Sequence, residues 1–297
     1  MNYIQKGIAL TLLGGILWGL SGVSGQYLLQ YRNWEAEWLV PVRMISAGVL
    51  TVIIAYLREG QKIFSIFRRP ADIVRLFIFG IIGLSMCQYA YFKAIQLSNA
   101  GIATVIQYTG PVLIIVYLFL RYQQKPKPKE ILAVLFAFAG VFILATHGKT
   151  DSLALPPLAL FWSIAAAFAL AVYNVQPVQL LKTYGTIPVV GFGMTVGSIP
   201  LLFLYPPYPI VGDWDVMAAL AFGNIVLLGT VVSFLAYLEG VKRVGPAKGS
   251  ILCSIEPIGS MVFAYMLLGT PFAGMDIIGC ALIILTIFLL AKTKETT

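Results

Sequence analysis

The sequence has few charged residues, a single histidine and three widely separated cysteines, and each scarcity excludes a class of protein. Only 11% of the residues are charged, 59% are hydrophobic and the mean hydropathy is +0.89, which excludes an ordinary soluble domain. Cys87, Cys253 and Cys280 have no paired spacing, so we expect neither a disulfide framework nor a metal site. No metalloprotease, phosphate-binding or paired-acid motif is present, so we expect no cofactor and no enzymatic activity.

Apolar runs recur from one end of the chain to the other. Their lengths match the roughly 17 to 25 residues that a helix needs to cross a hydrocarbon core about 30 Å thick. We therefore predict an all-α polytopic membrane protein with ten transmembrane helices, the first of which is too long for a cleavable signal peptide. The expected spans are Ile8 to Leu29, Leu39 to Leu57, Val74 to Phe92, Gly101 to Arg121, Ile131 to Thr146, Pro156 to Leu181, Ile187 to Tyr205, Val216 to Leu238, Ala247 to Leu268 and Met275 to Ala291.

The basic residues are distributed unevenly between the loops. The formal net charge is +8, but in a membrane protein such an excess reports orientation, and we expect no nucleic-acid partner. Most lysines and arginines follow the second, fourth, sixth, eighth and tenth spans, while acidic residues dominate the other loops. The positive-inside rule then predicts a multi-pass protein of the cell (plasma) membrane with both termini cytoplasmic.

An internal repeat is visible in two segments. Aligning "YFKAIQLSNAGIATVIQYTGPVL" from Tyr91 with "YLEGVKRVGPAKGSILCSIEPIG" from Tyr237 superposes Pro111 on Pro257 and, further on, Glu130 on Asp276. The predicted units are residues 1–147 and 148–297, with five helices each. Because five is odd, the second unit must be inverted in the membrane, which is the architecture of alternating-access carriers with a substrate site near the midplane.

Three prolines predict helix breaks within the spans. Pro111 and Pro257 should leave the carbonyl groups of Gln107 and Cys253 without their helical partners, and Pro177 is the third candidate. Such freed backbone groups are tolerated at membrane depth only against protein or in a wet cavity. The alternative is an ordinary kink that neighbouring helices repair.

Glu256 stands in the middle of the apolar stretch "GSILCSIEPIGSMVFAYMLL". An acidic group at helix centre costs roughly 3 kcal/mol on the insertion scale, so we expect its side chain to face the bundle interior. Its repeat counterpart is Gly110, which favours a functional role, with Glu256 as a substrate-binding and proton-coupling carboxylate. The structural alternative is a protonated Glu256 hydrogen-bonded across helices.

Polar and aromatic side chains on other spans complete the predicted substrate site. The candidates are Trp18, Gln26, Gln88, Tyr89, Gln107, Tyr108, Tyr173, Asn174, Tyr237 and Glu256. Such a pocket suits an amine held by cation–π attraction and charge pairing, or an aromatic amino acid held by stacking. For Arg43, about one turn inside the second span, we favour a side chain that snorkels to the outer boundary over a functional role.

These segments together resemble the EamA family of the drug/metabolite transporter superfamily. The resemblance rests on "LLGGILWGLSGVSGQYLL", "RMISAGVL", the two repeat segments above and the Glu256-Pro257 pair, and it covers nearly the whole chain. It implies a cavity formed mainly by helices one, three, four, six, eight and nine, and transport of small metabolites. Gln124 and Thr270 depart from the family pattern, which often has an acid at these positions.

We therefore predict a secondary transporter, specifically an exporter, of amino acids or related amines by alternating access, with the lipid bilayer as its surroundings and protons as a hypothetical coupling ion. The first alternative is a transporter of cationic drugs or quaternary or guanidinium amines. The alternative from another class is an intramembrane enzyme acting on a lipid or polyprenyl substrate. An enzyme would convert substrate in detergent without a second compartment, and a carrier would not.

Overall fold

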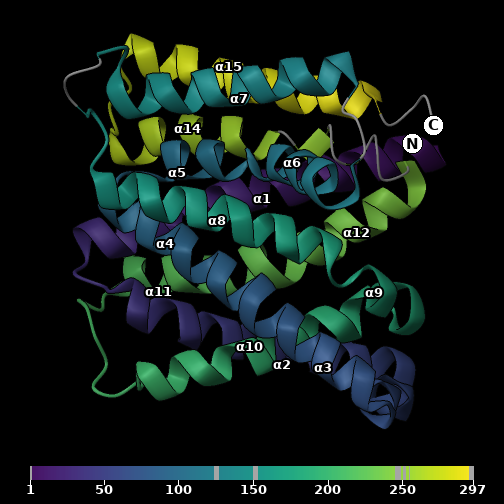
Figure 1. Cartoon of the computed structure of the whole chain (residues 1–297). Helices are drawn as coiled ribbons and strands as arrows, with labels where there is room; N and C mark the ends of the chain where they lie inside the picture. Colours follow the sequence, from purple (N-terminus) through teal and green to yellow (C-terminus); the bar gives the residue numbers. More distant parts are fainter. Residues whose placement is uncertain are drawn as a thin grey trace.

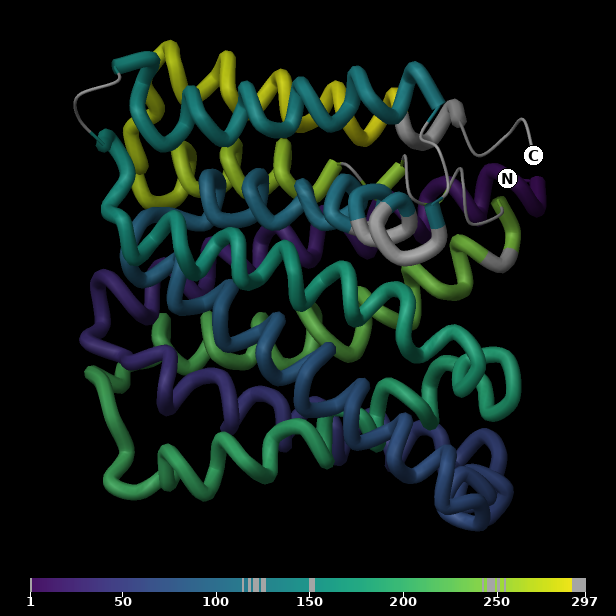
Figure 2. Tube along the Cα trace, in the orientation of Figure 1, coloured from purple at the N-terminus to yellow at the C-terminus, as the bar shows by residue number. Residues whose placement is uncertain are grey.

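The computed structural model describes residues 2–123, 127–149, 153–244, 249, 252–253 and 255–293, and in these residues every regular element is a helix. Figure 1 labels the helices, and Figure 2 follows the same path as a Cα tube. The elements are α1 (Tyr3–Tyr31), α2 (Ala36–Glu59), η1 (Gly60–Arg68), α3 (Pro70–Ile78), η2 (Phe79–Ser85), α4 (Met86–Leu97), α5 (Ala100–Gln107), α6 (Gly110–Tyr122), α7 (Pro128–Thr146), α8 (Pro157–Val175), α9 (Val178–Tyr184), α10 (Thr186–Leu204), α11 (Val216–Gly223), η3 (Asn224–Val232), α12 (Ser233–Val244), α14 (Ile255–Leu268) and α15 (Gly274–Thr293).

Within the described residues, seven helical segments are long and apolar enough to cross a membrane. They confirm an all-helical multi-pass membrane protein, while the predicted count of ten is not confirmed. The fourth predicted span is divided between α5 and α6, and α14 is a shorter apolar helix. The predicted start of the ninth span at Ala247, like Gln124, lies outside the described residues.

Proline and short polar residues mark many of the helix starts. Pro70, Pro111, Pro128 and Pro157 occupy the first turns of α3, α6, α7 and α8, where the missing N–H group would have no helical partner in any case. Elsewhere an N-cap side chain accepts a backbone N–H, as Asn99 Oδ1 does from Ile102 at 2.9 Å. The breaks between spans are therefore local features of the sequence.

The helices pack in pairs around a central α1. Helix α1 lies against α12 and α14, α8 lies against α4, α2 pairs with α10, and α7 pairs with α15 along one side of the bundle. The chain begins α1 and finishes α15 at the same end of the bundle (Figure 1). The loops from α1 to α2 and from α10 to α11 lie at the opposite end.

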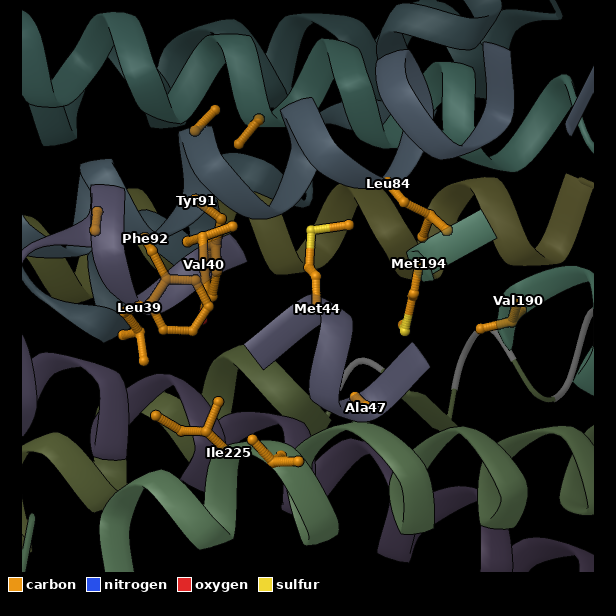
Figure 3. Close-up of a cluster of buried hydrophobic side chains, with 14 of the residues drawn as sticks. Leu39, Val40, Met44, Ala47, Leu84, Tyr91, Phe92, Val190, Met194 and Ile225 are labelled. Carbon is orange, nitrogen blue, oxygen red and sulfur yellow. The ribbon is translucent and has the colours of Figure 1, made fainter. Parts of the chain in front are cut away.

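The largest buried core joins α2 to the third, seventh and eighth predicted spans. Figure 3 shows its centre, where the side chains come from α2 (Leu39, Val40, Met44 and Ala47), η2 (Leu84), α4 (Tyr91 and Phe92), α10 (Val190 and Met194) and η3 (Ile225). All of them are buried. Because lipid chains are as apolar as these residues, close packing holds this core together more than the hydrophobic effect does.

The third and eighth predicted spans each contain a π-helical segment in their middle. In the third span η2 joins α3 to α4, and in the eighth η3 joins α11 to α12. π-Helical turns are uncommon and occur often at functional sites. Their presence in two long apolar helices was not predicted, because hydrophobic periodicity does not distinguish an α-helical turn from a π-helical one.

Glycines allow η2 and α10 to approach backbone to backbone. A Cβ atom on Gly80 would lie 2.6 Å from the carbonyl oxygen of Gly193, and one on Gly197 would overlap the carbonyl oxygen of Gly80. Small residues at four-residue spacing are the usual means of close helix contact in membranes. The Gly193 and Gly197 pair in α10 follows that rule.

We expect Gly197→Ala to destabilise the fold by about 1–3 kcal/mol, because the added methyl group overpacks a backbone contact. The measurement is the melting temperature of the purified protein in detergent. Gly223→Ala is the matched control, since a Cβ at Gly223 meets nothing within 4 Å and alanine is the better helix former. Equal melting temperatures for the two variants would contradict the close approach of η2 and α10.

Candidate functional site

The Glu256 carboxyl group is hydrogen-bonded to a tyrosine from the other half of the chain. Glu256 lies half-buried in the first turn of α14, and its Oε2 atom accepts a 2.6 Å hydrogen bond from the Tyr108 hydroxyl group. The same hydroxyl oxygen is 3.3 Å from the carbonyl oxygen of Cys253. Since the bond to Glu256 is shorter and charge-assisted when the carboxyl is ionised, it is the stronger of the two.

The break before Pro111 places Tyr108. Helix α5 ends at Gln107, α6 begins at Gly110, and Tyr108 lies in the turn between them. The sequence predicted that Pro257 would free the Cys253 carbonyl group, and this is the group that Tyr108 approaches. The two repeat-matched prolines thus flank the same contact, one on each side.

Aromatic and thiol side chains from four further elements lie within electrostatic range of the Glu256 carboxyl group or pack against a side chain that does. Its carboxyl group interacts electrostatically with Cys87 and Tyr91 of α4, Tyr173 of α8, Tyr237 of α12 and its own neighbour Cys253. Trp18 of α1 packs on Tyr237 with ring centroids 5.2 Å apart. Gln107 Nε2 donates to Cys87 Sγ at 3.3 Å. We call this group, together with Tyr108, the central cluster.

The central cluster gathers six of the ten predicted substrate-site residues: Trp18, Gln107, Tyr108, Tyr173, Tyr237 and Glu256. They come from α1, the end of α5, α8, α12 and α14. Tyr173 also borders the π-helical segment η2, since its ring stacks on Phe79 at 5.9 Å and its backbone lies beside Gly83. Cys87, Tyr91 and Cys253 were not among the predicted residues.

Three predicted residues belong to other networks. Gln26 is buried, accepts from the Ala100 backbone N–H at 2.9 Å and donates to Thr270 Oγ1 at 3.0 Å. Tyr89 donates to Glu37 Oε1 at 3.2 Å, beside the ion pair between Glu37 and Lys93. Asn174 is exposed and donates to the Leu170 carbonyl of its own helix. Amide and hydroxyl spacing in the sequence does not reveal which backbone groups need these partners.

Two further predictions concern Gln88 and Pro177. Gln88 is half-buried on α4. Pro177 is the N-cap of α9, and it follows the end of α8 at Val175. Nearby, Gln176 Nε2 donates to the Arg75 carbonyl at 2.9 Å, which ties this break to α3 at the end of the bundle where the chain begins. The break at Pro177 therefore lies away from the central cluster, unlike the one at Pro111.

Arg43 differs from its predicted position. Its side chain is only 5% exposed and does not snorkel to the boundary. A guanidinium nitrogen donates to Thr230 Oγ1 in η3 at 3.0 Å, and the guanidinium carbon lies 4.7 Å from the centroid of the Phe92 ring. Its distance of about one turn from the helix end suggested snorkelling, but the sequence contained no information on the π-helical partner that holds it inside.

No group of three or more histidine, cysteine, aspartate or glutamate side chains with metal-binding geometry occurs in the part of the chain that the structure describes. The chemistry available to the central cluster is that of one carboxyl group, several phenol groups, two thiol groups, an indole ring and an amide. These groups bind by charge, hydrogen bonding and ring stacking.

Comparison with known proteins decides the family. The model of the EamA-like transporter family matches the chain twice, over residues 5–146 and again over residues 157–292. The chain belongs to the EamA-like transporter family. This confirms the resemblance drawn from the sequence motifs.

Relatives of the transporter carry consistent descriptions. It is 35% identical over 291 residues to the "Uncharacterized inner membrane transporter YicL" of Salmonella typhimurium, covering 98% of this chain and 97% of that protein. The "Aromatic amino acid exporter YddG" of Ancylobacter novellus is 23% identical over 257 residues, with 82% of this chain and 86% of that protein covered. A solved crystal structure shares the fold, with a TM-score of 0.63, 19% identity and coverage of 98% and 99% of the two chains.

The hydrogen bond between Tyr108 and Glu256 predicts non-additive effects on stability. Tyr108→Phe should cost about 1–3 kcal/mol, because it leaves a carboxyl group in the bundle without its hydrogen-bond donor. In a Glu256→Gln background the same change should cost less. Melting temperatures of the wild type, the two single variants and the double variant give the coupling energy.

The matched control is Tyr265→Phe, which removes the same hydroxyl group from an exposed side chain on α14. It should leave the melting temperature unchanged in both backgrounds. Strictly additive losses for Tyr108→Phe and Glu256→Gln would contradict the bond.

Proposed function

We propose that this transporter exports small organic solutes, amino acids or related amines, by alternating access between two inverted five-helix halves, residues 1–147 and 148–297. The observation that carries the proposal is the 2.6 Å hydrogen bond at the centre of the central cluster, which joins a carboxyl group from one half to a tyrosine from the other. Carriers with inverted repeats bind substrate near the midplane, where the repeats meet.

The helix contacts support two related halves. If α1 and α8 are counterparts, as the repeat predicts, then α4 corresponds to α12 and α5 with α6 corresponds to α14. Helix α1 packs against α12 and α14, and α8 packs against α4, α5 and α6. The pairs α2 with α10 and α7 with α15 map onto themselves. This exchange of contacts is what a two-fold axis between repeats produces.

Two local features of the first half recur in the second half at the spacing of the sequence repeat. The π-helical segments η2 and η3 contain Gly83 and Gly229, which are separated by the same number of residues as Tyr91 and Tyr237. Glu130 accepts the backbone N–H of the residue three positions earlier, Lys127, at 2.8 Å, and its counterpart Asp276 accepts that of Ala273 at 2.8 Å. Aligned glutamate and aspartate thus have the same capping role.

The two halves differ at the position that matters for binding. A Cβ atom on Gly110 would lie 2.9 Å from the carbonyl oxygen of Ala167, so this position has little room for a side chain. Its counterpart Glu256 presents a carboxyl group to the central cluster. The repeated scaffold therefore carries a carboxyl group at this position in the second half and none in the first. A single carboxylate suits a substrate with one amino group.

The substrate class follows from charge and ring chemistry. A carboxylate among tyrosine and tryptophan rings attracts an ammonium group by charge and by the negative faces of the rings. That a relative is named an aromatic amino acid exporter supports amino acids over other amines. A transporter of cationic drugs or of quaternary or guanidinium amines is the second candidate, since the same groups attract any organic cation.

Glu256 is also the proposed proton-coupling group. A carboxyl group that exchanges a bound proton for an ammonium group, and that faces one side of the membrane at a time, couples the two movements. The proposed orientation has both termini cytoplasmic in the cell membrane, in keeping with the basic loops and with the common end at which α1 begins and α15 finishes.

The test is transport by the full chain in proteoliposomes. Labelled amino acids and quaternary or guanidinium amines are offered with and without an imposed pH gradient, to the wild type and to Glu256→Gln. We expect gradient-driven accumulation by the wild type and at least a tenfold loss of it in Glu256→Gln, because the amide carries neither charge nor exchangeable proton. Downhill counterflow should survive at solute concentrations high enough to offset the weaker binding of the ammonium group.

Glu239→Gln is the control for this test, because it makes the same chemical change at an exposed position on α12. It should accumulate solute as the wild type does. Normal accumulation by Glu256→Gln would refute the coupling role. Conversion of a lipid or polyprenyl substrate in detergent, with no solute moved, would replace transport by the enzymatic alternative.

A further inference from the structure

Arg43 is a buried cation inside the membrane-spanning part of α2. Its side chain is 95% buried, since its relative exposure is 5%. A guanidinium group has five N–H donors and is always charged in proteins. The structure provides one hydrogen bond, to Thr230 Oγ1 at 3.0 Å, and one ring face, that of Phe92 at 4.7 Å. Most of the five N–H donors of Arg43 therefore have no hydrogen-bond acceptor among the described residues.

The charge of Arg43 also lacks a counter-ion. Among the residues that the structure describes, none of the ion pairs involves Arg43, and the acidic partners go to Arg32, Arg75, Lys93, His147 and Arg243. Charged side chains within membrane spans are rare and mark substrate or ion pathways when they face the bundle interior. A buried guanidinium with free donors is suited to an anionic group that arrives from outside.

The position of Arg43 relative to Glu256 indicates which anion. The Phe92 ring that faces Arg43 packs edge-on against Tyr91, with ring centroids 5.3 Å apart. The Tyr91 hydroxyl group is hydrogen-bonded to Thr104 Oγ1 at 2.8 Å, and Thr104 Oγ1 lies 3.3 Å from Ser260 Oγ, one turn after Glu256 on α14. A chain of contacts therefore joins Arg43 on α2 to the helix that carries Glu256, and the ion pairs of the described residues include none between the two.

We propose that Arg43 binds the carboxylate of a zwitterionic amino acid whose ammonium group is held by Glu256, so that the central cluster and Arg43 form one site with two charged ends. This inference rests on the proposed transport function and narrows it to substrates that carry both groups. A carboxylate and a guanidinium form a bidentate pair, and binding both ends of a substrate distinguishes it from a simple amine or a simple acid.

Thr230 is the hydrogen-bond acceptor of Arg43 in this structure. The substrate carboxylate binds Arg43 beside Thr230 or in its place. Its hydroxyl donates to the carbonyl of Ile225, five residues earlier in η3, at 2.8 Å, and accepts from Arg43. The acceptor that holds Arg43 is thus a neutral hydroxyl group on a π-helical turn. A carboxylate is the stronger acceptor for a guanidinium, because it carries the opposite charge and can accept two parallel N–H bonds.

The wild-type protein alone provides the first measurement. Affinities of the purified full chain in nanodiscs are measured for phenylalanine, leucine, threonine and lysine, each beside its own amide, which keeps the ammonium group and lacks the carboxylate. Phenylpropionate, which lacks the ammonium group, is measured as the third compound beside phenylalanine and its amide. We expect the amino acid with the highest affinity to bind at least about 30-fold more tightly than its amide, a typical loss when one partner of a buried charged pair is removed.

Two variants assign the charged ends. Arg43→Gln should weaken the amino acid to the level of its amide and leave the affinity for the amide unchanged, while Glu256→Gln should bring phenylalanine to the level of phenylpropionate. Arg43→Lys should recover only part of the preference, because it keeps the charge and loses the bidentate geometry.

The inference is overturned if the wild type binds amides as tightly as amino acids, or if Arg43→Gln weakens both equally. Transport of amides and amines with no preference for a carboxylate would leave the proposed carrier function standing and remove only the role of Arg43. Absence of binding and counterflow for every compound in the series would remove both.

Discussion

A carboxyl group within an apolar bundle needs a partner, and the hydrogen bond from Tyr108 to Glu256 supplies one across the two halves of the chain. The bond depends on the break between α5 and α6, because a continuous helix would keep Tyr108 in register with its neighbours. That break depends on Pro111 at the start of α6, and the approach of Tyr108 to Cys253 depends on Pro257. The break between α5 and α6 thus gives one ionisable group inside the bundle a hydrogen-bond donor from the other half of the chain.

Much of this fold follows from the sequence. The apolar runs gave the positions of most helices to within a few residues: α1 extends from Tyr3 to Tyr31 where Ile8 to Leu29 was expected, and α7 ends at Thr146 as predicted. Length and composition are sufficient there because the membrane imposes a single element type. The carboxylate and the prolines were visible for the same reason, since polar or helix-breaking residues are conspicuous in an apolar background. Six of ten predicted site residues belong to the central cluster, since polar side chains within membrane spans almost always face the bundle interior.

The remaining features depend on which helices become neighbours, and spacing along the chain does not contain that information. Gln26 was a predicted substrate-site residue, yet it closes a network between Ala100 and Thr270. Arg43 lies near a helix end in the sequence, yet the π-helical turn of η3 and the ring of Phe92 hold it inside the bundle. Hydrophobic periodicity does not predict the π-helical turns of η2 and η3 either.

In the proposed transport cycle the two halves expose one site, around Glu256, alternately to the two sides of the membrane. Cys253 tests it directly, because this buried thiol lies beside the Tyr108 hydroxyl group. In a Cys87→Ser, Cys280→Ser background, Cys253 is labelled with a membrane-impermeant thiol reagent applied to either side of oriented proteoliposomes. The account predicts labelling from both sides, and slower labelling when a transported amino acid is bound. Labelling from one side only, or labelling that bound solute does not slow, would contradict it.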